Sequence, residues 1–198
     1  MLNKETTYSQ ARLNLATILD QVCDQREIVV IKRRNEKNVA LIAEDELSSL
    51  LECVYLLRSP ENAKRLFRAL EWTQTAMETP QTLAELKEEL GIECKKKKPD
   101  THNEEKELCG YFPVFSPDFK ADLAWWYNHD RKKGDKILDL VADILDGQPF
   151  TGLGKPEPLK YIAPDTWSRR IDLEHRLVYK VTQNKVYFLQ ARYHYESD

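Results

Sequence analysis

The chain has 198 residues, of which 41% are hydrophobic and 32% are charged, and its formal net charge is −3. This composition can fill one modest core or two small ones, and it excludes a membrane protein because no stretch is apolar enough to cross a bilayer. Residues 1–8 contain no apolar run of the kind that an export signal requires, so we expect a cytoplasmic protein with no membrane partner.

In chain order, the first half predicts a helix that begins near Ser9, strands over residues 28–31 and 39–43, a helix over 47–57 and a helix from Ser59-Pro60 to Leu70. The strands are rich in β-branched residues, and the basic turn Arg33-Arg34-Asn35-Glu36 between them is typical of a hairpin. A serine followed by proline is a common helix start, because proline is tolerated in the first turn.

The segment that follows Thr79-Pro80 predicts a short acidic helix. Its sequence TLAELKEELG places Leu83, Leu86 and Leu90 on one side and ends at a glycine. Because ten residues make a marginal helix alone, it is either a solvated surface helix or a segment that folds on a basic partner. Residues 94–110 contain four consecutive lysines and few apolar side chains, which indicates a linker.

The second half predicts a compact domain of two helices and an antiparallel sheet. In chain order the pattern gives a strand over residues 112–115, a helix from Ser116-Pro117, a helix over 137–145, and strands over 167–173, 176–181 and 186–193. This order is typical of an α+β domain.

The cysteines form no metal or disulfide pattern. None of them belongs to a C-x-x-C pair, and they are far apart in sequence: Cys23, Cys53, Cys94 and Cys109. A disulfide scaffold or a zinc site would need closely spaced pairs, so we predict free thiols, no metal and no cofactor.

The end of the chain carries residues suited to cleaving RNA without a metal. Residues 155–195 have 8 Lys and Arg against 4 Asp and Glu, an excess that can meet phosphate. Attack by the 2′-hydroxyl needs a base, an acid and cations that hold the phosphate. The tail offers Glu157, Arg170, Arg176, His194 and Tyr195. From the residues alone, a solvated strand face with alternating arginines and tyrosines remains the alternative.

The motifs GKPEPLK, TWSRRI, EHRLVYKV and ARYHY, in this order and spacing, resemble the YoeB group of the RelE superfamily of toxin ribonucleases over about residues 115–195. The resemblance implies the RelE-like microbial ribonuclease fold and cleavage of messenger RNA in the ribosomal A site, leaving a 2′,3′-cyclic phosphate. Carried over by position, it implies Glu157 as general base, His194 as general acid, Arg176 as phosphate clamp and Tyr195 as an orienting or stacking residue. Lys160 and Arg170 become secondary RNA contacts.

The N-terminal half is similar to the YefM/Phd family of antitoxins over about residues 6–70, through YSQARLNL, VALI and EDELSSLLECVYLLRSPENAKRL. This resemblance implies an α/β domain with a helical C-terminal extension, a homodimer formed through that domain, and operator DNA as a partner. It points to Arg12 and Arg33 as DNA contacts, with Arg34 adding charge beside a phosphate. For Arg12, a helix-surface role is the alternative.

The two resemblances together predict an α+β protein of two small domains. The expected parts are an antitoxin dimerisation and DNA-binding domain over residues 1–70, a toxin-neutralising segment over 71–93, a linker over 94–110 and a toxin domain over 111–198. We expect residues 82–93, of the same chain or of a dimer partner, to occlude the catalytic residues of the toxin. The leucines named above would anchor this segment, and its acids would face the basic tail of the toxin: Glu85, Glu88, Glu89 and Glu93.

Three readings of the whole chain are open. The first is a natural fusion in which a competent ribonuclease is held inactive by its own antitoxin. The second is a DNA-binding repressor whose toxin part is a catalytically inert co-repressor; the retained set from Glu157 to Tyr195 favours the first over it. The third is an engineered antitoxin–toxin fusion, although Gly-Ser repeats would be the usual choice for such a linker.

Overall fold

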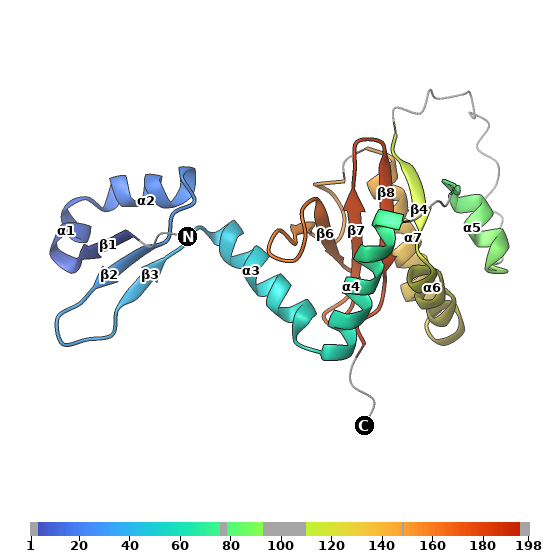
Figure 1. The fold of residues 1–198 in the computed structure, drawn as a ribbon, viewed down its shortest axis with the longest axis horizontal. Coiled ribbons are helices and arrows are strands. Elements are labelled where there is room, and N and C mark those ends of the chain that lie inside the picture. Colours follow the sequence, from blue (N-terminus) through green and yellow to red (C-terminus); the bar gives the residue numbers. More distant parts are fainter. Residues whose placement is uncertain (1–3, 76–78, 93–109, 148, 195–198) are drawn as a thin grey trace. The chain divides into compact units, whose positions relative to one another are not determined.

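The structure is a computed structural model, and it describes residues 4–75, 79–92, 110–147 and 149–194 (Figure 1). Nearly all of the predicted linker, and Tyr195, lie outside the described residues. The chain divides into two compact units, residues 1–51 and 52–198. No described helix is long and apolar enough to cross a membrane.

The first unit contains a three-stranded sheet and two short helices. Its elements are β1 (Lys4–Thr7), α1 (Tyr8–Leu13), α2 (Leu15–Asp24), β2 (Val29–Lys32), β3 (Val39–Leu41) and the start of α3 (Glu44–Leu57). Strand β2 pairs with β1 in parallel and with β3 in an antiparallel hairpin. The small core consists of Ala11, Ile18, Val22 and Val29.

Local chemistry explains why these elements begin and end where they do. The hydroxyl of Thr7 accepts a hydrogen bond from Gln10 N, and the Gln10 side chain returns to Thr7 N, so a capping box begins α1. Asn35 has φ of +62°, a left-handed turn conformation that asparagine tolerates, and it closes the predicted hairpin. The sequence pattern missed β1, and the single helix expected after Ser9 is interrupted at Asn14.

The second unit is an α+β arrangement around a five-stranded sheet. Its elements are the end of α3, α4 (Pro60–Thr75), α5 (Leu83–Glu89), β4 (Phe112–Phe115), α6 (Pro117–His129), α7 (Arg131–Leu145), β5 (Glu157–Pro158), β6 (Thr166–Arg170), β7 (Arg176–Val181) and β8 (Lys185–Gln190). The strand order is β4-β8-β7-β6-β5, with β4 parallel to β8 and the other pairs antiparallel. The predicted α+β class is confirmed, while the short strand β5 was not expected.

Both faces of this sheet are covered by helices (Figure 1). On one face, α6 and α7 pack against Leu177, Tyr179 and Phe188. On the other face, the end of α3 and α4 pack against Val178 and Leu189. Residues 52–75 therefore lie on the sheet that the C-terminal half of the chain builds.

Helix α5 packs against the core next to strand β4. Gln81 N donates to Pro113 O at 3.0 Å, so the chain before α5 pairs with this edge strand. Leu86 is fully buried in the core that contains Phe115 and Phe119. The predicted leucine face of this segment is thus the face that packs, with Leu83 and Leu90 partly buried beside it.

We predict that Leu86→Ala releases α5 from the core. Removing a fully buried leucine side chain lowers the free energy of docking by about 2–5 kcal/mol. A helix of seven residues is not stable without its packing, so it should unfold once it is released. Hydrogen exchange of the amides in residues 83–89 should become much faster than in the parent. Glu88→Ala, at an exposed position of the same helix, is the matched control, and equal protection in both variants would contradict the assigned packing.

Candidate active site and its helical cover

The predicted general base, Glu157, lies on the short edge strand β5. It pairs in register with Ser168 of β6, and its side chain is almost fully buried. Lys155 Nζ lies 2.9 Å from its carboxylate. The preceding loop passes so close to the core that a Cβ on Gly154, which has φ of +78°, would meet Leu140 at 2.8 Å. Glycine therefore allows the loop to bring Glu157 against the sheet.

The predicted phosphate clamp, Arg176, is held by a carboxylate from helix α3. Its Nε donates to Glu52 Oε1 at 2.6 Å, and both side chains are buried. The hydroxyl of Ser168 donates to the same oxygen at 2.8 Å. The guanidinium also lies over the ring of Tyr55, 5.0 Å from its centroid. Glu52 therefore occupies the space between Arg176 and the strand that carries the partner of Glu157.

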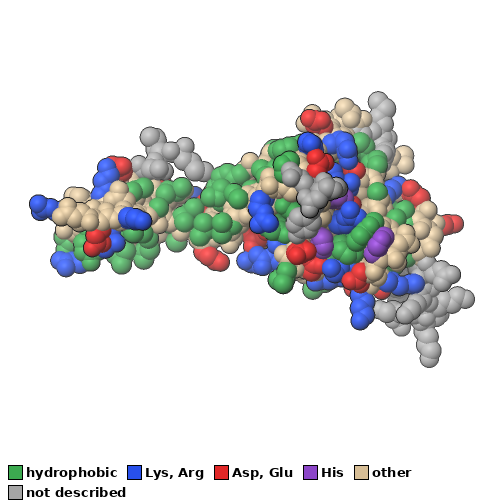
Figure 2. Space-filling view, turned by 90° about the horizontal axis from the view of Figure 1, so that it is seen from below, with side chains coloured by type: hydrophobic (Ala, Val, Ile, Leu, Met, Phe, Trp, Pro, Cys, Tyr) green, Lys and Arg blue, Asp and Glu red, His purple; other side chains and the backbone are tan. Residues whose placement is uncertain are grey.

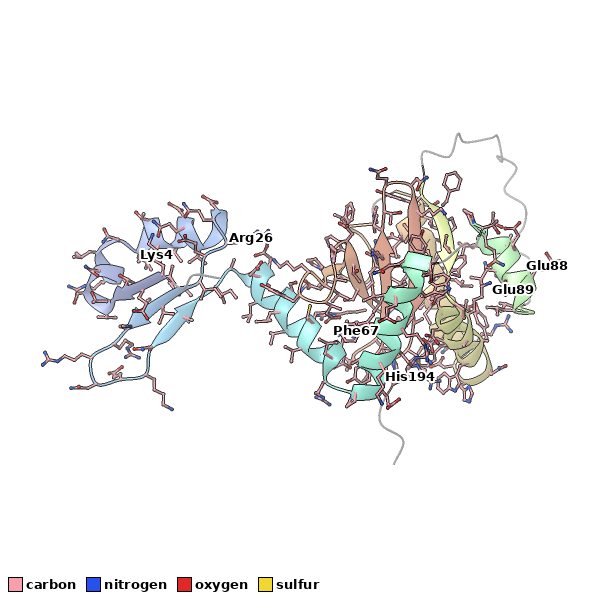
Figure 3. All side chains as sticks on the ribbon, viewed as in Figure 1. Lys4, Arg26, Phe67, Glu88, Glu89 and His194 are labelled. Carbon is pink, nitrogen blue, oxygen red and sulfur yellow. The ribbon has the colours of Figure 1, made fainter. Side chains whose placement is uncertain are left out.

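The predicted general acid, His194, is held beneath helix α4 (Figure 3). Its backbone N donates to Asn62 Oδ1 at 3.2 Å, and its carbonyl accepts from the Ser59 hydroxyl at 2.6 Å. On the ring, Nε2 lies 3.1 Å from Asp122 Oδ1, and Nδ1 lies 3.4 Å from Arg192 Nη2. Both ring nitrogens thus have partners inside the protein.

The remaining predicted RNA contacts are at the surface. Lys160 is exposed and stacks on the ring of Tyr161, 5.6 Å from its centroid. Arg170 is exposed and is the cross-strand neighbour of Arg176. Figure 2 shows acidic, basic and histidine side chains gathered on one face of this unit. Within the described ranges, no group of three or more His, Cys, Asp or Glu side chains could hold a metal ion.

Two further groups organise the tail before His194. The Nδ1 atom of His175 accepts a hydrogen bond from Tyr193 N at 3.1 Å, which requires a lone pair on that nitrogen. Burial lowers the pKa of His175 and so favours the neutral form that can accept. The buried Arg169 forms an ion pair with Asp143 and donates to the carbonyls of Thr151 and Leu153, which holds the loop before Glu157.

The sequence did not indicate that residues of α3 and α4 contact the predicted catalytic residues. Glu52 lies on α3, Ser59 in the turn before α4 and Asn62 on α4, and all three are buried among apolar side chains. Polar side chains in such surroundings are the one available signal that they meet polar partners. Their partners are more than 100 residues away in the chain, which no local pattern reports.

Comparisons with known proteins match each half of the chain to a different family. A model of YoeB-like toxins of bacterial type II toxin-antitoxin systems matches residues 115–195, and a model of Phd/YefM antitoxins of type II systems matches residues 3–76. The toxin YoeB of Mycobacterium bovis is 48% identical over 81 residues, which are 41% of this chain and 94% of that protein. The antitoxin YefM of Escherichia coli is 33% identical over 79 residues, 40% of this chain and 95% of that protein.

The chain belongs to both families: it is a YefM-like antitoxin fused to a YoeB-like toxin. Among solved structures, the heterotetrameric YoeB-YefM toxin-antitoxin complex from Staphylococcus aureus contains a chain that is 38% identical, with a TM-score of 0.40; the match covers 43% of this chain and 98% of that one. The family models and the two relatives confirm the resemblances inferred from the motifs. We call residues 3–76 the antitoxin region and residues 115–195 the toxin region.

The acidic segment after the antitoxin region does not lie where we expected. Glu89 pairs with Lys120 of α6 at 2.7 Å, Glu85 caps its own helix through Thr82, and Glu88 is exposed, while Glu93 lies outside the described residues. The bond to Lys120 lowers the pKa of Glu89. Among the described residues, Arg176 and His194 are instead contacted from the antitoxin region, by Glu52, Ser59 and Asn62. Helix α5 packs against the core beside β4.

The first unit carries a basic hollow at the end of its hairpin. A cavity of about 640 Å³ is lined by Thr7, Tyr8, Ser9, Lys32, Arg33, Arg34 and Glu36. Two of the three predicted DNA contacts, Arg33 and Arg34, lie there, and Arg33 forms an ion pair with Glu36. Arg12 is exposed on α1 but is not among the lining residues.

We predict that Glu52→Ala destabilises the second unit by about 3–5 kcal/mol, because it leaves the buried guanidinium of Arg176 without its counter-charge. Chemical denaturation of the full chain would measure the loss. The matched control is Glu61→Ala on α4, whose carboxylate pairs with Lys64 at the surface and whose removal should leave the transition unchanged. Equal unfolding free energies of the two variants would show that Glu52 does not stabilise the second unit in this way.

Proposed function

We propose that the toxin region is a metal-independent endoribonuclease that cleaves messenger RNA in the ribosomal A site, and that the antitoxin region holds it inactive in the intact chain. In this proposal Glu157 takes the proton from the 2′-hydroxyl, His194 protonates the leaving 5′-oxygen, and Arg176 stabilises the phosphate. The product is a 2′,3′-cyclic phosphate. Tyr195 orients or stacks on the RNA, and the exposed Lys160 and Arg170 contact neighbouring phosphates.

The observation that carries the proposal is the carboxylate of Glu52 on Arg176. Carboxylates and phosphates each present a pair of oxygen atoms to the same N–H donors of a guanidinium, so one anion excludes the other. With Glu52 Oε1 2.6 Å from Nε of Arg176, a phosphate cannot reach this face of the guanidinium. An antitoxin that delivers a buried carboxylate to this arginine thus supports both the assignment of a phosphate site and its inhibition.

Contacts to His194 support the same conclusion for the acid. Ser59 and Asn62 bind the backbone of His194, and both ring nitrogens have partners within the protein. The two ring partners, Asp122 and Arg192, belong to the toxin region, whereas Ser59 and Asn62 bind the backbone that carries the ring. In this proposal the start of α4 fixes that backbone and must release it before the acid can reach a leaving oxygen. The retained set of Glu157, Arg176 and His194 favours an enzyme over an inert co-repressor.

Helix α5 acts as an anchor in this scheme. Leu83, Leu86 and Leu90 attach it to the toxin region, with Glu89 on Lys120 at the rim. Two attachment sites in one chain raise the local concentration of each, so α3 and α4 rebind quickly after partial opening. We therefore assign the neutralising role to residues 52–75 and to α5 together.

The first unit is proposed to bind operator DNA as a homodimer, which would repress transcription. The hollow with Arg33 and Arg34 offers cations for the phosphate backbone, and Arg12 adds a third. Leu13, Leu15 and Leu19 are exposed on α1 and α2, which is unfavourable for apolar side chains unless another surface covers them. A two-fold dimer would present two such hollows to a palindromic site.

The nuclease assignment predicts that residues 111–198, produced alone, cleave ribosome-bound messenger RNA. They contain the whole sheet, α6, α7 and nearly all of the core around Phe188, and they include the match to almost all of a YoeB toxin, so we expect them to fold on their own. Primer extension after cell-free translation would reveal the cuts. The full chain should give at least about 100-fold less cleavage.

Glu157→Gln and His194→Ala should each lower cleavage by residues 111–198 by a factor of about 100 or more, and added chelator should change nothing. Glu174→Gln and His129→Ala, at exposed positions, are the matched controls. Full activity in both test variants would refute the assigned acid and base.

The DNA assignment predicts that Arg12→Ala combined with Arg33→Ala removes binding of the full chain to its operator, because two phosphate contacts are lost from each half-site. A gel shift at several salt concentrations would measure it. Lys64→Ala combined with Lys132→Ala removes the same charge from exposed positions outside the first unit and should leave binding unchanged. If the double arginine variant binds like this control, the contacts lie elsewhere.

A further inference from the structure

A buried carboxylate lies beside the proposed acid and has no role in the set inferred from the sequence. Asp122 on α6 is only 2% exposed. Its Oδ1 lies 3.1 Å from Nε2 of His194, and its Oδ2 accepts a hydrogen bond from Ala191 N at 3.0 Å. The carboxylate therefore joins the helix to the tail that carries His194.

The orientation of Asp122 is fixed from several directions. The peptide of Ala191 is held at both ends, since its carbonyl accepts from Trp126 Nε1 at 2.9 Å while its N–H binds Asp122. Trp126 lies one helical turn after Asp122, so two side chains of α6 bind the backbone N–H and C=O of Ala191. A carboxylate fixed in this way can set the orientation of the imidazole of His194, three residues after Ala191.

A buried carboxylate also needs compensation for its charge. In the intact chain Arg65 of α4 supplies it, with Nη2 2.9 Å from Asp122 Oδ1. When α4 leaves, Arg65 leaves with it. Two groups of the described toxin region then remain near Asp122: Arg192, which interacts with it electrostatically, and Nε2 of His194 at 3.1 Å.

We propose that Asp122 is the positioning residue of the proposed general acid: it holds Nε2–H of His194 and stabilises the imidazolium, so that Nδ1 faces the leaving 5′-oxygen. This inference rests on the proposed ribonuclease function. A carboxylate that binds one nitrogen of a histidine fixes its tautomer and ring orientation, and leaves the other nitrogen free for the substrate. In the inhibited chain the Nδ1 atom is the nitrogen that faces the side chain of Arg192.

The test is a double-mutant cycle in residues 111–198, which correspond to a complete toxin. Asp122→Asn keeps an oxygen for Ala191 N but removes the charge and turns an N–H donor toward Nε2. We expect kcat to fall about 100-fold while KM changes less than about threefold. In the His194→Ala background the same substitution should have no further effect on kcat, because residues that act as a unit are not additive.

Asp118→Asn is the matched control, since Asp118 lies one turn earlier on α6 and also faces Arg65, at 3.7 Å. It should retain kcat within about twofold, and thermal unfolding of each variant separates lost folding from lost positioning. If the parent cleaves and Asp122→Asn keeps full kcat, or lowers kcat equally with and without His194, this inference is overturned while the ribonuclease stands. A parent that does not cleave would overturn both.

Discussion

The ion pair between Glu52 and Arg176 is the contact on which the closed state of the second unit depends, because both charges are buried and water cannot replace either partner. Without Glu52 the guanidinium keeps the carbonyls of Asp172, Leu173 and His175 but loses its counter-charge. In the proposed mechanism, that guanidinium needs an anion in either state: the carboxylate of the antitoxin or the phosphate of the RNA. Inhibition and substrate binding thus use one charge, and the two states exclude each other.

The antitoxin region meets the toxin region with matched charges at two points. It places a carboxylate on Arg176 and a guanidinium on Asp122, and both pairs lie within 3 Å. This complementarity is local: it joins individual buried groups and does not follow from the net charge of either half. The apolar packing of Leu56 and Leu66 against Val178 and Leu189 surrounds these pairs and keeps water away from them.

Local features of the sequence predicted the elements well, and long-range contacts limited the rest. The Ser59-Pro60 start of α4 and the leucine face of α5 follow from spacing and capping, which a single segment encodes. Strand β5 is two residues long and forms through the pairing of Glu157 and Pro158 with β6. Two residues are too few to show an alternating hydrophobic pattern in the sequence.

The site divides in the same way. The motifs that carry Glu157, Arg176 and His194 are visible in the sequence, and the structure brings Arg176 and the strand partner of Glu157 together around Glu52. The segment that covers the site was predicted from charge, which pointed to the acidic residues of α5. Charge alone was not sufficient. Glu85 caps its own helix and Glu89 pairs with Lys120, whereas Glu52, on a largely apolar face of α3, binds Arg176.

The order of these groups along the chain has a consequence for synthesis. A ribosome makes α3 and α4 first, and it makes β8 and His194 more than 100 residues later. At about 5–20 residues per second, these helices exist for several seconds before the last strand emerges. The final strand and the tail can therefore assemble directly on α4, so the proposed inhibitor of each newly made toxin region is present before the proposed acid is in place.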